Sequence, residues 1–339
     1  MSITISGTQK RVGLALSGGG FRAAAFHLGV FKKLKALGLL DKIDLLSCVS
    51  GGSIAGGALA VGWKTLDAML QRFEKYLKTR SIAVSSVVMG LLDPFQSRTD
   101  KLADSYDADL FEGAKLGSLE SGPRVYFNTT NLATGNLFFI TAGGGRGAEI
   151  GDHELGVETR PDFLVSRAVA ASSSFPPVFP PLKLSPQEYP RRELAEYVTL
   201  TDGGVYDNLG VNPMLLDRNK LDYAIVSDAG APFSLDATPN ESGLGVMTVL
   251  IQILMEQVRG LQFDRLKSHH KSGSGPKPLF FSIDSIEGEL QKGDAQLASA
   301  IGTNLKRLSD AEMDVLGRHG GALVEARIRK YAPELLLKP

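Results

Sequence analysis

Apolar residues near the N-terminus form two short runs, separated by a segment with helical periodicity. Residues 11–17 and 43–49 are largely apolar, which predicts two buried strands. Between them, residues 21–37 place apolar side chains every three or four positions, with lysines off that stripe, which predicts a helix. A strand, a helix and a strand in this order imply neighbouring parallel strands, with helices on both faces of the sheet.

The rest of the chain shows the same two patterns. Alternating or continuous apolar runs predict further strands at residues 125–130, 137–141, 197–202, 224–228 and 279–283. Helical spacing predicts helices at residues 66–78, 163–171 and 246–266. The apolar run at 82–92 is expected to pack in the core, with a lid or an acyl-chain groove as the alternative. The glycines at 143–145, which no helix follows, are expected to form a flexible loop.

Composition removes several classes of protein. The chain has 339 residues, of which 43% are hydrophobic. Its formal net charge is +0, so it has no excess of positive charge that would favour binding to nucleic acid. Its single cysteine excludes an internal disulfide framework and a multi-cysteine metal site. The N-terminus lacks the pattern of a secretory signal, and the longest apolar stretches are too short to span a bilayer. We therefore expect a cytoplasmic or peripheral membrane protein, and export without a cleavable signal stays open.

Ser50 lies where the second predicted strand turns into a helix, with Gly51 and Gly52 directly behind it. A serine on such a tight turn exposes its hydroxyl above the sheet edge, at a helix N-terminus where negative charge is favoured. These are the requirements of a nucleophilic serine. The nucleophile pattern G-x-S-x-G is matched only in part, because Cys48 occupies the first glycine position. The alternative is a serine that simply caps the helix.

The first predicted strand ends in three successive glycines, Gly18, Gly19 and Gly20. Residues without Cβ let the backbone approach a ligand and aim its N–H groups inward. A dinucleotide phosphate loop is one interpretation, but the next strand ends in Ser50 and not in the acidic residue that this fingerprint requires. The other is an oxyanion hole, in which the N–H groups of Gly19 and Gly20 hold the developing charge. Arg22 could add positive charge there, or it could be a surface residue of the first helical turn.

Asp202 ends the predicted strand at 197–202 and is followed by two glycines. A nucleophilic serine needs a base, and none of the five histidines has a comparable place at a strand end. The reference pKa of an aspartate is about 3.9, so it is a weak base near neutral pH. Partial burial and a hydrogen bond with the serine hydroxyl could make it competent. The alternative for this motif alone is an Asp-Gly turn.

Four motifs, taken together and in this order, resemble the patatin-like phospholipase family. They are the glycine loop at 18–22, the serine turn at 48–53, the Ala/Ser helix end with its Phe-Pro-Pro segment at 168–181, and Asp-Gly-Gly at 202–204. The resemblance spans roughly residues 10–230. It implies a three-layer α/β/α patatin-like fold with a mostly parallel central sheet. It also implies one catalytic domain over residues 8–339, with a C-terminal helical part at 240–339 packed on the motif core.

The resemblance also implies a function. The chain would be a lipid acyl hydrolase, a phospholipase A-type esterase, in which Ser50 and Asp202 act as a dyad without histidine. The glycine loop at 18–20, with Arg22 nearby, would be its oxyanion hole. A phospholipid or other acyl-ester lipid would be the substrate, with peripheral membrane contact and with no metal or cofactor needed for the cleavage. Two alternatives remain: a non-catalytic lipid-binding protein on the same fold and, less favoured, a dinucleotide-binding α/β enzyme.

Overall fold

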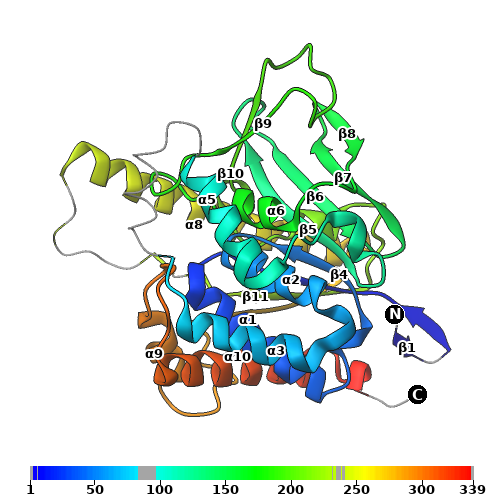
Figure 1. Ribbon diagram of the computed structural model, residues 1–339. Coiled ribbons are helices and arrows are strands. Elements are labelled where there is room, and N and C mark those ends of the chain that lie inside the picture. Colours follow the sequence, from blue (N-terminus) through cyan, green and yellow to red (C-terminus); the bar gives the residue numbers. More distant parts are fainter. Residues whose placement is uncertain are drawn as a thin grey trace.

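The computed structural model describes residues 3–5, 7–82, 97–230, 232–233, 238 and 241–336, and it is built around one central sheet (Figure 1). The strands of this sheet are β3 (Val12–Leu16), β4 (Ile43–Cys48), β5 (Arg124–Asn131), β6 (Leu137–Gly143), β7 (Arg146–Asp152), β8 (Gly156–Thr159), β9 (Leu182–Leu184), β10 (Val198–Asp202), β11 (Tyr223–Asp228) and β12 (Lys277–Ser282). In the described residues they lie in the order β12-β11-β3-β4-β5-β6-β7-β8, and β10 joins β5 and carries β9. A separate ribbon pairs β1 (Ile3–Ile5) with β2 (Thr8–Lys10).

The predicted α/β class is confirmed, and the sheet is mixed. Strands β12, β11, β3, β4 and β5 are parallel neighbours. The pairs from β5 to β8 and those of β10 are antiparallel. The expectation of a mostly parallel sheet therefore holds only for the half that contains the first strand-helix-strand unit. From β5 to β8 the connections are too short for the crossover that parallel neighbours need.

The glycines at 143–145 form part of a tight hairpin turn and not the flexible loop that the sequence suggested. Gly143 ends β6, and only Gly144 and Gly145 separate it from β7. All three have positive φ values of 80°, 66° and 69°. Glycine adopts this left-handed region without the steric cost that a side chain would bring, so the run encodes the turn itself.

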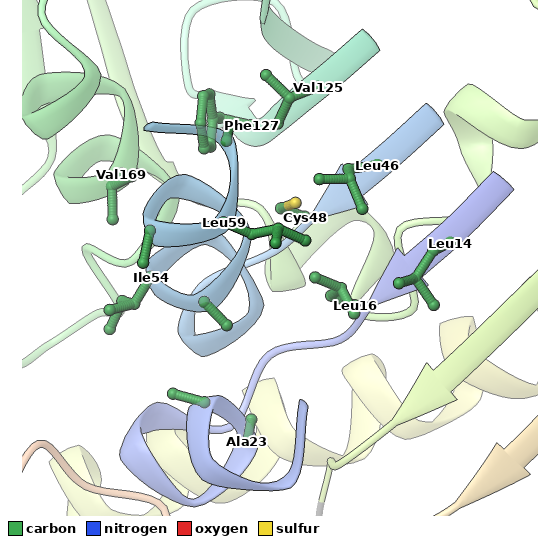
Figure 2. Packing of buried hydrophobic residues seen from close by; sticks show 14 of the residues in the cluster. Leu14, Leu16, Ala23, Leu46, Cys48, Ile54, Leu59, Val125, Phe127 and Val169 are labelled. Carbon is green, nitrogen blue, oxygen red and sulfur yellow. The ribbon is translucent and has the colours of Figure 1, made fainter. Parts of the chain in front are cut away.

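Side chains on successive positions of the parallel strands enter two different cores. Leu14, Leu46 and Phe127 belong to the larger core, whereas the neighbouring Leu45 and Tyr126 belong to the smaller core on the opposite face. This alternation is the period of two that strands impose. Figure 2 shows part of the larger core, where side chains of β3, β4 and β5 face helices α2 (Gly51–Val61) and α6 (Val165–Ser172). Both faces of the sheet are thus covered, as a three-layer fold requires.

The larger core also takes side chains from helices α1 (Gly20–Ala36), α3 (Leu66–Thr79), α5 (Arg98–Tyr106), α9 (Asp294–Ala300) and α10 (Asp310–Tyr331). The smaller core is closed by α8 (Gly243–Lys271) and the turn η5 (Asn212–Leu215). Short helical turns complete the list: η1 (Leu40–Lys42), η2 (Trp63–Thr65), η3 (Asp107–Phe111), η4 (Leu116–Leu119), α7 (Gly204–Asp207) and η6 (Pro333–Leu336). In the described part of the chain, no helix combines the length and apolarity that crossing a bilayer requires.

Most predicted elements are found close to their expected positions. The helices predicted at 66–78, 163–171 and 246–266 correspond to α3, α6 and α8, and the strands predicted at 125–130 and 137–141 correspond to β5 and β6. Except for Ile82, the apolar run at 82–92 lies outside the described residues. The limits of the domain, 8–339, stay a prediction.

Helices α1 and α10 pack backbone against backbone. A Cβ placed on Gly29 would lie 2.1 Å from the carbonyl oxygen of Gly317, and one on Gly320 would lie 2.4 Å from that of Phe26. Real Cβ atoms do not approach backbone so closely, so glycine is required at both places. This contact fixes the C-terminal helix on the helix that begins at the glycine loop.

We expect Gly29→Ala to destabilise the fold by about 1–3 kcal/mol, because the added methyl forces α1 and α10 apart. Gly317→Ala is the matched control, since a Cβ there meets nothing within 4 Å. It should leave stability unchanged or raise it by up to about 1 kcal/mol through helix propensity. Urea unfolding of both variants measures the difference, and equal stabilities would contradict the proposed close contact.

Candidate active site

Ser50 forms the turn between β4 and α2 in a backbone conformation that side chains rarely adopt, with φ 51° and ψ −117°. The turn is held by backbone bonds: Ser50 N donates to Ser172 O at 3.1 Å, and Ser50 O accepts from Ser53 N at 2.8 Å. The side chain is half-buried and makes no capping bond to α2. The capping alternative is therefore wrong, and the hydroxyl remains available for another partner.

The two glycines after Ser50 let the serine turn press against the first glycine loop. A Cβ on Gly51 would lie 2.2 Å from Gly20 O, and a Cβ on Gly52 would lie 2.2 Å from Leu16 O. From the other side, a Cβ on Gly18 would lie 3.1 Å from the Cβ of Ser50. The strand ends of β3 and β4 thus meet through residues that lack side chains.

Cys48 fits at the position where the nucleophile pattern has glycine, because a glycine faces it from α2. A Cβ on Gly56 would lie 2.2 Å from Cys48 Sγ. The side chain of Cys48 is completely buried among apolar neighbours of the larger core (Figure 2). This burial raises the pKa of its thiol, so the group stays protonated and behaves as a small apolar side chain. The departure from the pattern leaves the serine turn intact.

Unpaired N–H groups gather at the two turns. Gly19 and Gly20 have φ values of 136° and 61°, which turn the chain sharply into α1. Gly18 N is occupied, since it donates to Asn208 O at 3.3 Å. In the described part of the chain, no hydrogen bond is found for the N–H groups of Gly19, Gly20 and Gly51. Gly20 and Gly51 are the first residues of α1 and α2, where helices leave N–H donors free.

Arg22 is a buried positive charge that supports the glycine loop, and its expected role at the oxyanion hole stays a prediction. Its side chain is buried, with 1% of the residue exposed, so the surface alternative is wrong. Its guanidinium donates to Ile301 O at 2.9 Å and to Ala229 O at 2.8 Å. Burial lowers the pKa of Arg22 to about 10, against the opposing effect of Asp228, so the group stays charged at neutral pH. Arg22 ties the start of α1 to two distant segments.

Strands β4 and β10 meet along one edge of β5. Cys48 at the end of β4 pairs with Phe127, and Asp202 at the end of β10 pairs with Thr129. Since β4 is parallel to β5 and β10 is antiparallel to it, the two strands run toward each other and stop on either side of Asn128. Asn128 Nδ2 donates to Cys48 O at 3.0 Å, which closes the junction. This topology brings the turn after β4 to the end of β10.

Asp202 is buried, with 1% of the residue exposed, and one of its oxygens has no partner. Oδ1 accepts from Gly204 N at 2.7 Å, while Oδ2 has no hydrogen bond. Burial raises the pKa of Asp202 to about 7, opposed by the side chain of Ser50 and the N–H of Gly204. The Ser50 hydroxyl thus lies close enough to the Asp202 carboxyl to lower its pKa. The bond from Gly204 N makes Asp202 part of an Asp-Gly turn that leads into α7, so the expected turn is present and holds the carboxylate at the strand end.

Ser172 is a site residue that the sequence did not single out. Its carbonyl accepts from both Ser50 N at 3.1 Å and Gly203 N at 3.3 Å. Its hydroxyl donates to Asn128 O at 2.6 Å and lies 2.7 Å from Ser53 Oγ. Ser172 therefore connects the serine turn, the aspartate turn and β5. It is one of three successive serines at the end of α6, and no local signal distinguishes it from the other two.

The buried histidines serve other parts of the fold. His27 lies between Ser227 Oγ and Ser17 O, at 3.0 Å from each, and burial lowers its pKa to about 4. His319 Nε2 lies 2.8 Å from Ile283 O. Within the described residues, no histidine is hydrogen-bonded to Ser50 or Asp202, and no group of three or more His, Cys, Asp or Glu is placed to hold a metal ion.

We expect Asp202→Asn to stabilise the protein at high pH and not at low pH. The folded-state pKa of Asp202, about 7, exceeds its ordinary value of 3.8, so folding favours the protonated form. Stability of the wild type should therefore fall as pH rises from about 4 to about 7, on the order of 3 kcal/mol, and the amide cannot show this loss. Urea unfolding at pH 4 and pH 8, with the exposed Asp217→Asn as control, measures the effect. A difference that does not depend on pH would refute the assignment.

Comparisons with known proteins identify the family and the fold. A family model described as patatin-like phospholipase matches residues 14–215. No curated protein matches the chain. The fold resembles human GIVD cytosolic phospholipase A2 with a TM-score of 0.61 and 13% identity, over 96% of this chain and 60% of that one. The complex of that enzyme with methyl gamma-linolenyl fluorophosphonate and terbium chloride gives 0.61 and 15%, over 96% and 59%.

A weaker likeness is found to VipD from Legionella pneumophila, with a TM-score of 0.43 and 13% identity, over 95% of this chain and 67% of that one. At these identities the likeness to solved structures concerns the fold alone. The chain spans about 60% of the length of the human enzyme's chain. The family model, in contrast, matches more than half of this chain and includes both Ser50 and Asp202. The chain belongs to the patatin-like phospholipase family.

Proposed function

We propose that this protein hydrolyses acyl esters of phospholipids or related lipids, with Ser50 as nucleophile and Asp202 as general base. One observation carries the proposal: a buried carboxylate oxygen without a partner, Asp202 Oδ2, lies near the strained turn of Ser50. An unpaired buried carboxylate destabilises a fold, so its presence beside a half-buried hydroxyl favours a chemical role. Membership of the family supplies the reaction class, lipid acyl hydrolysis.

In the first step, Ser50 Oγ attacks the ester carbonyl carbon while its proton passes to Asp202 Oδ2. The carbonyl oxygen becomes negatively charged, and the free N–H groups of Gly19, Gly20 and Gly51 stabilise it by hydrogen bonds. The intermediate then breaks its bond to the alcohol. Asp202 returns the proton to the departing alkoxide, so the alcohol leaves and an acyl ester on Ser50 remains.

The second step repeats the chemistry with water. The Asp202 carboxylate takes a proton from a water molecule, whose oxygen attacks the acyl carbon. The same N–H groups hold the second oxyanion. When this intermediate collapses, the bond to Ser50 Oγ breaks and Asp202 returns the proton to that oxygen. The fatty acid leaves, and both side chains regain their starting states.

The buried environment of Asp202 makes it a better base than an aspartate in water. A base is most effective when its pKa lies close to the working pH. Burial raises the pKa of Asp202 to about 7, whereas an aspartate in water ionises at a much lower pH. The carboxylate therefore needs no histidine to accept a proton near neutrality.

The alternative of a lipid-binding protein without catalysis does not explain the same features. Binding of a lipid requires an apolar surface, but it requires neither the strained backbone of Ser50 nor a buried carboxylate of raised pKa. Liposome binding without acyl release would favour this alternative. The dinucleotide alternative gains no support from the geometry, because the glycine loop faces Ser50.

We expect Ser50→Ala and Asp202→Asn each to lower kcat/KM for a soluble short-chain nitrophenyl ester by roughly 10³-fold or more, because each removes one half of the proton transfer. The control is Ser118→Ala, which changes an exposed serine and should keep the wild-type rate. Full activity of either site variant would rule out this mechanism.

The pH profile gives an independent check. Asp202 acts as a base only when it is ionised, so kcat/KM should rise with pH through a midpoint at about 7 and level off above it. The measurement uses a neutral ester, whose own ionisation does not change. A profile that is already flat from pH 5 upward would show that a group of lower pKa is the base.

A further inference from the structure

Helix α8 carries an apolar surface that the described residues of the fold leave exposed. From Val246 to Arg265 no side chain of the helix is buried, and Leu266 is the first that is. Six large apolar side chains are between 37% and 68% exposed: Val246, Met247, Leu250, Ile253, Leu254 and Leu261. In Figure 1 the first turns of α8 extend beyond the body of the molecule. Exposed apolar side chains in one continuous group commonly mark an interaction surface.

These six side chains form a single ridge. Their spacings of three, four and seven residues place them on one side of the helix. The ridge from Val246 to Leu261 is about 22 Å long at the rise of an α-helix. No charged residue occurs between Gly243 and Met255. We call the six residues the α8 ridge.

The opposite side of α8 reaches the candidate active site. A Cβ on Gly204 would lie 3.0 Å from the terminal methyl of Met255, and Gly204 N is the donor to Asp202. Arg259 forms an ion pair with the buried Asp228, at the end of the strand next to the one that leads into the glycine loop. The inner side of α8 is therefore anchored at the site, and its ridge points away from it.

We propose that the α8 ridge docks the protein on the surface of a lipid bilayer or micelle, next to the site that cleaves the lipid. This inference rests on the proposed function, which makes a lipid the substrate. Amphipathic helices lie in such an interface with their apolar side immersed by about 5–10 Å. A helix is about 10 Å thick. A lipid would therefore move about that distance, from the membrane surface at the ridge to Ser50 and Asp202 on the other side of α8.

The chemistry of the helix favours a lipid surface over a protein. A narrow convex ridge presents little contact area to a protein that lacks a matching surface, whereas lipid chains adapt to any shape. A protein interface also uses polar groups around its apolar centre, and the ridge has no charged neighbour before Glu256. Glu256 is bound to Arg259 on the inner side. The last turn of α8 ends in His269, His270 and Lys271, where anionic headgroups would be attracted.

A second copy of the chain is the main competing occupant, and it would need a groove for the ridge. Within the described residues, a cavity of about 140 Å³ lies between α2 and α3, lined by residues that include Ala58, Met69 and Phe73. This volume is too small for a helical ridge of this length. This cavity therefore does not receive the ridge of a second copy.

The test compares two triple variants in sedimentation with vesicles of ether-linked phosphatidylcholine and phosphatidylglycerol, which cannot be hydrolysed. Leu250→Gln, Leu254→Gln and Leu261→Gln remove the ridge, and vesicle affinity should fall by about tenfold or more. The matched control changes Ile286, Leu290 and Leu297 to Gln, which are between 60% and 73% exposed elsewhere, and its affinity should equal that of the wild type. Because ether lipids measure binding alone, failure of the proposed catalysis would not affect this result.

A fluorescence measurement does not depend on the folding of a triple variant. The emission of Leu254→Trp, after subtraction of the Trp63 signal, should shift to shorter wavelength when these vesicles are added, and that of Leu290→Trp should not. Unchanged affinity of the ridge variant, or no shift for Leu254→Trp, would overturn the proposal. Loss of a dimer in the ridge variant, with vesicle affinity retained, would also overturn it and assign the ridge to a second copy.

Discussion

Strands β4 and β10 run toward each other along the same edge of β5, so both must end beside Asn128. The candidate site depends on this constraint. The turns after these strands can meet only where the backbone has no side chains. A Cβ on Gly51 would strike Gly20 O at 2.2 Å, and a Cβ on Gly203 would strike Asn128 O at 2.2 Å. The close approach buries Asp202 and places the side chain of Ser50 where it acts on the Asp202 carboxyl. Packing of glycine against backbone is thus the origin of both the geometry and the electrostatics.

The candidate site destabilises the folded chain, and contacts elsewhere in the fold offset this cost. Ser50 holds a strained backbone, and Asp202 has a buried oxygen with no partner, so both lower the stability of the folded chain. They persist because surrounding contacts leave no alternative: Ser172 binds both turns, and Arg22 holds the start of α1. Large cores on the two faces of the sheet provide the balancing stability. Burial raises the pKa of Asp202 to about 7, well above that of a free aspartate.

Local patterns in the sequence predict what depends on neighbours along the chain, and they miss what depends on packing. Strand period, helix spacing and the glycines located β3, β4 and the turn at Ser50, because backbone geometry alone determines these signals. The partner of Arg22 at Ile301 is 279 residues away, and the choice of Ser172 among three serines depends on where α6 meets β5. The exposure of α8 was equally hidden, since its apolar spacing is also that of a buried helix. Distances between Ser50 and Asp202 follow from strand pairing, which no local pattern encodes.

Covalent labelling with a long-chain fluorophosphonate, located by peptide mapping, tests the central claim most directly. The reagent reacts with a serine whose proton is removed as it attacks. The account predicts one label, on Ser50, formed at a rate that rises with pH through about 7 and that drops sharply in Asp202→Asn. A label on another serine, or labelling of Ser50 at an undiminished rate in Asp202→Asn, would contradict it.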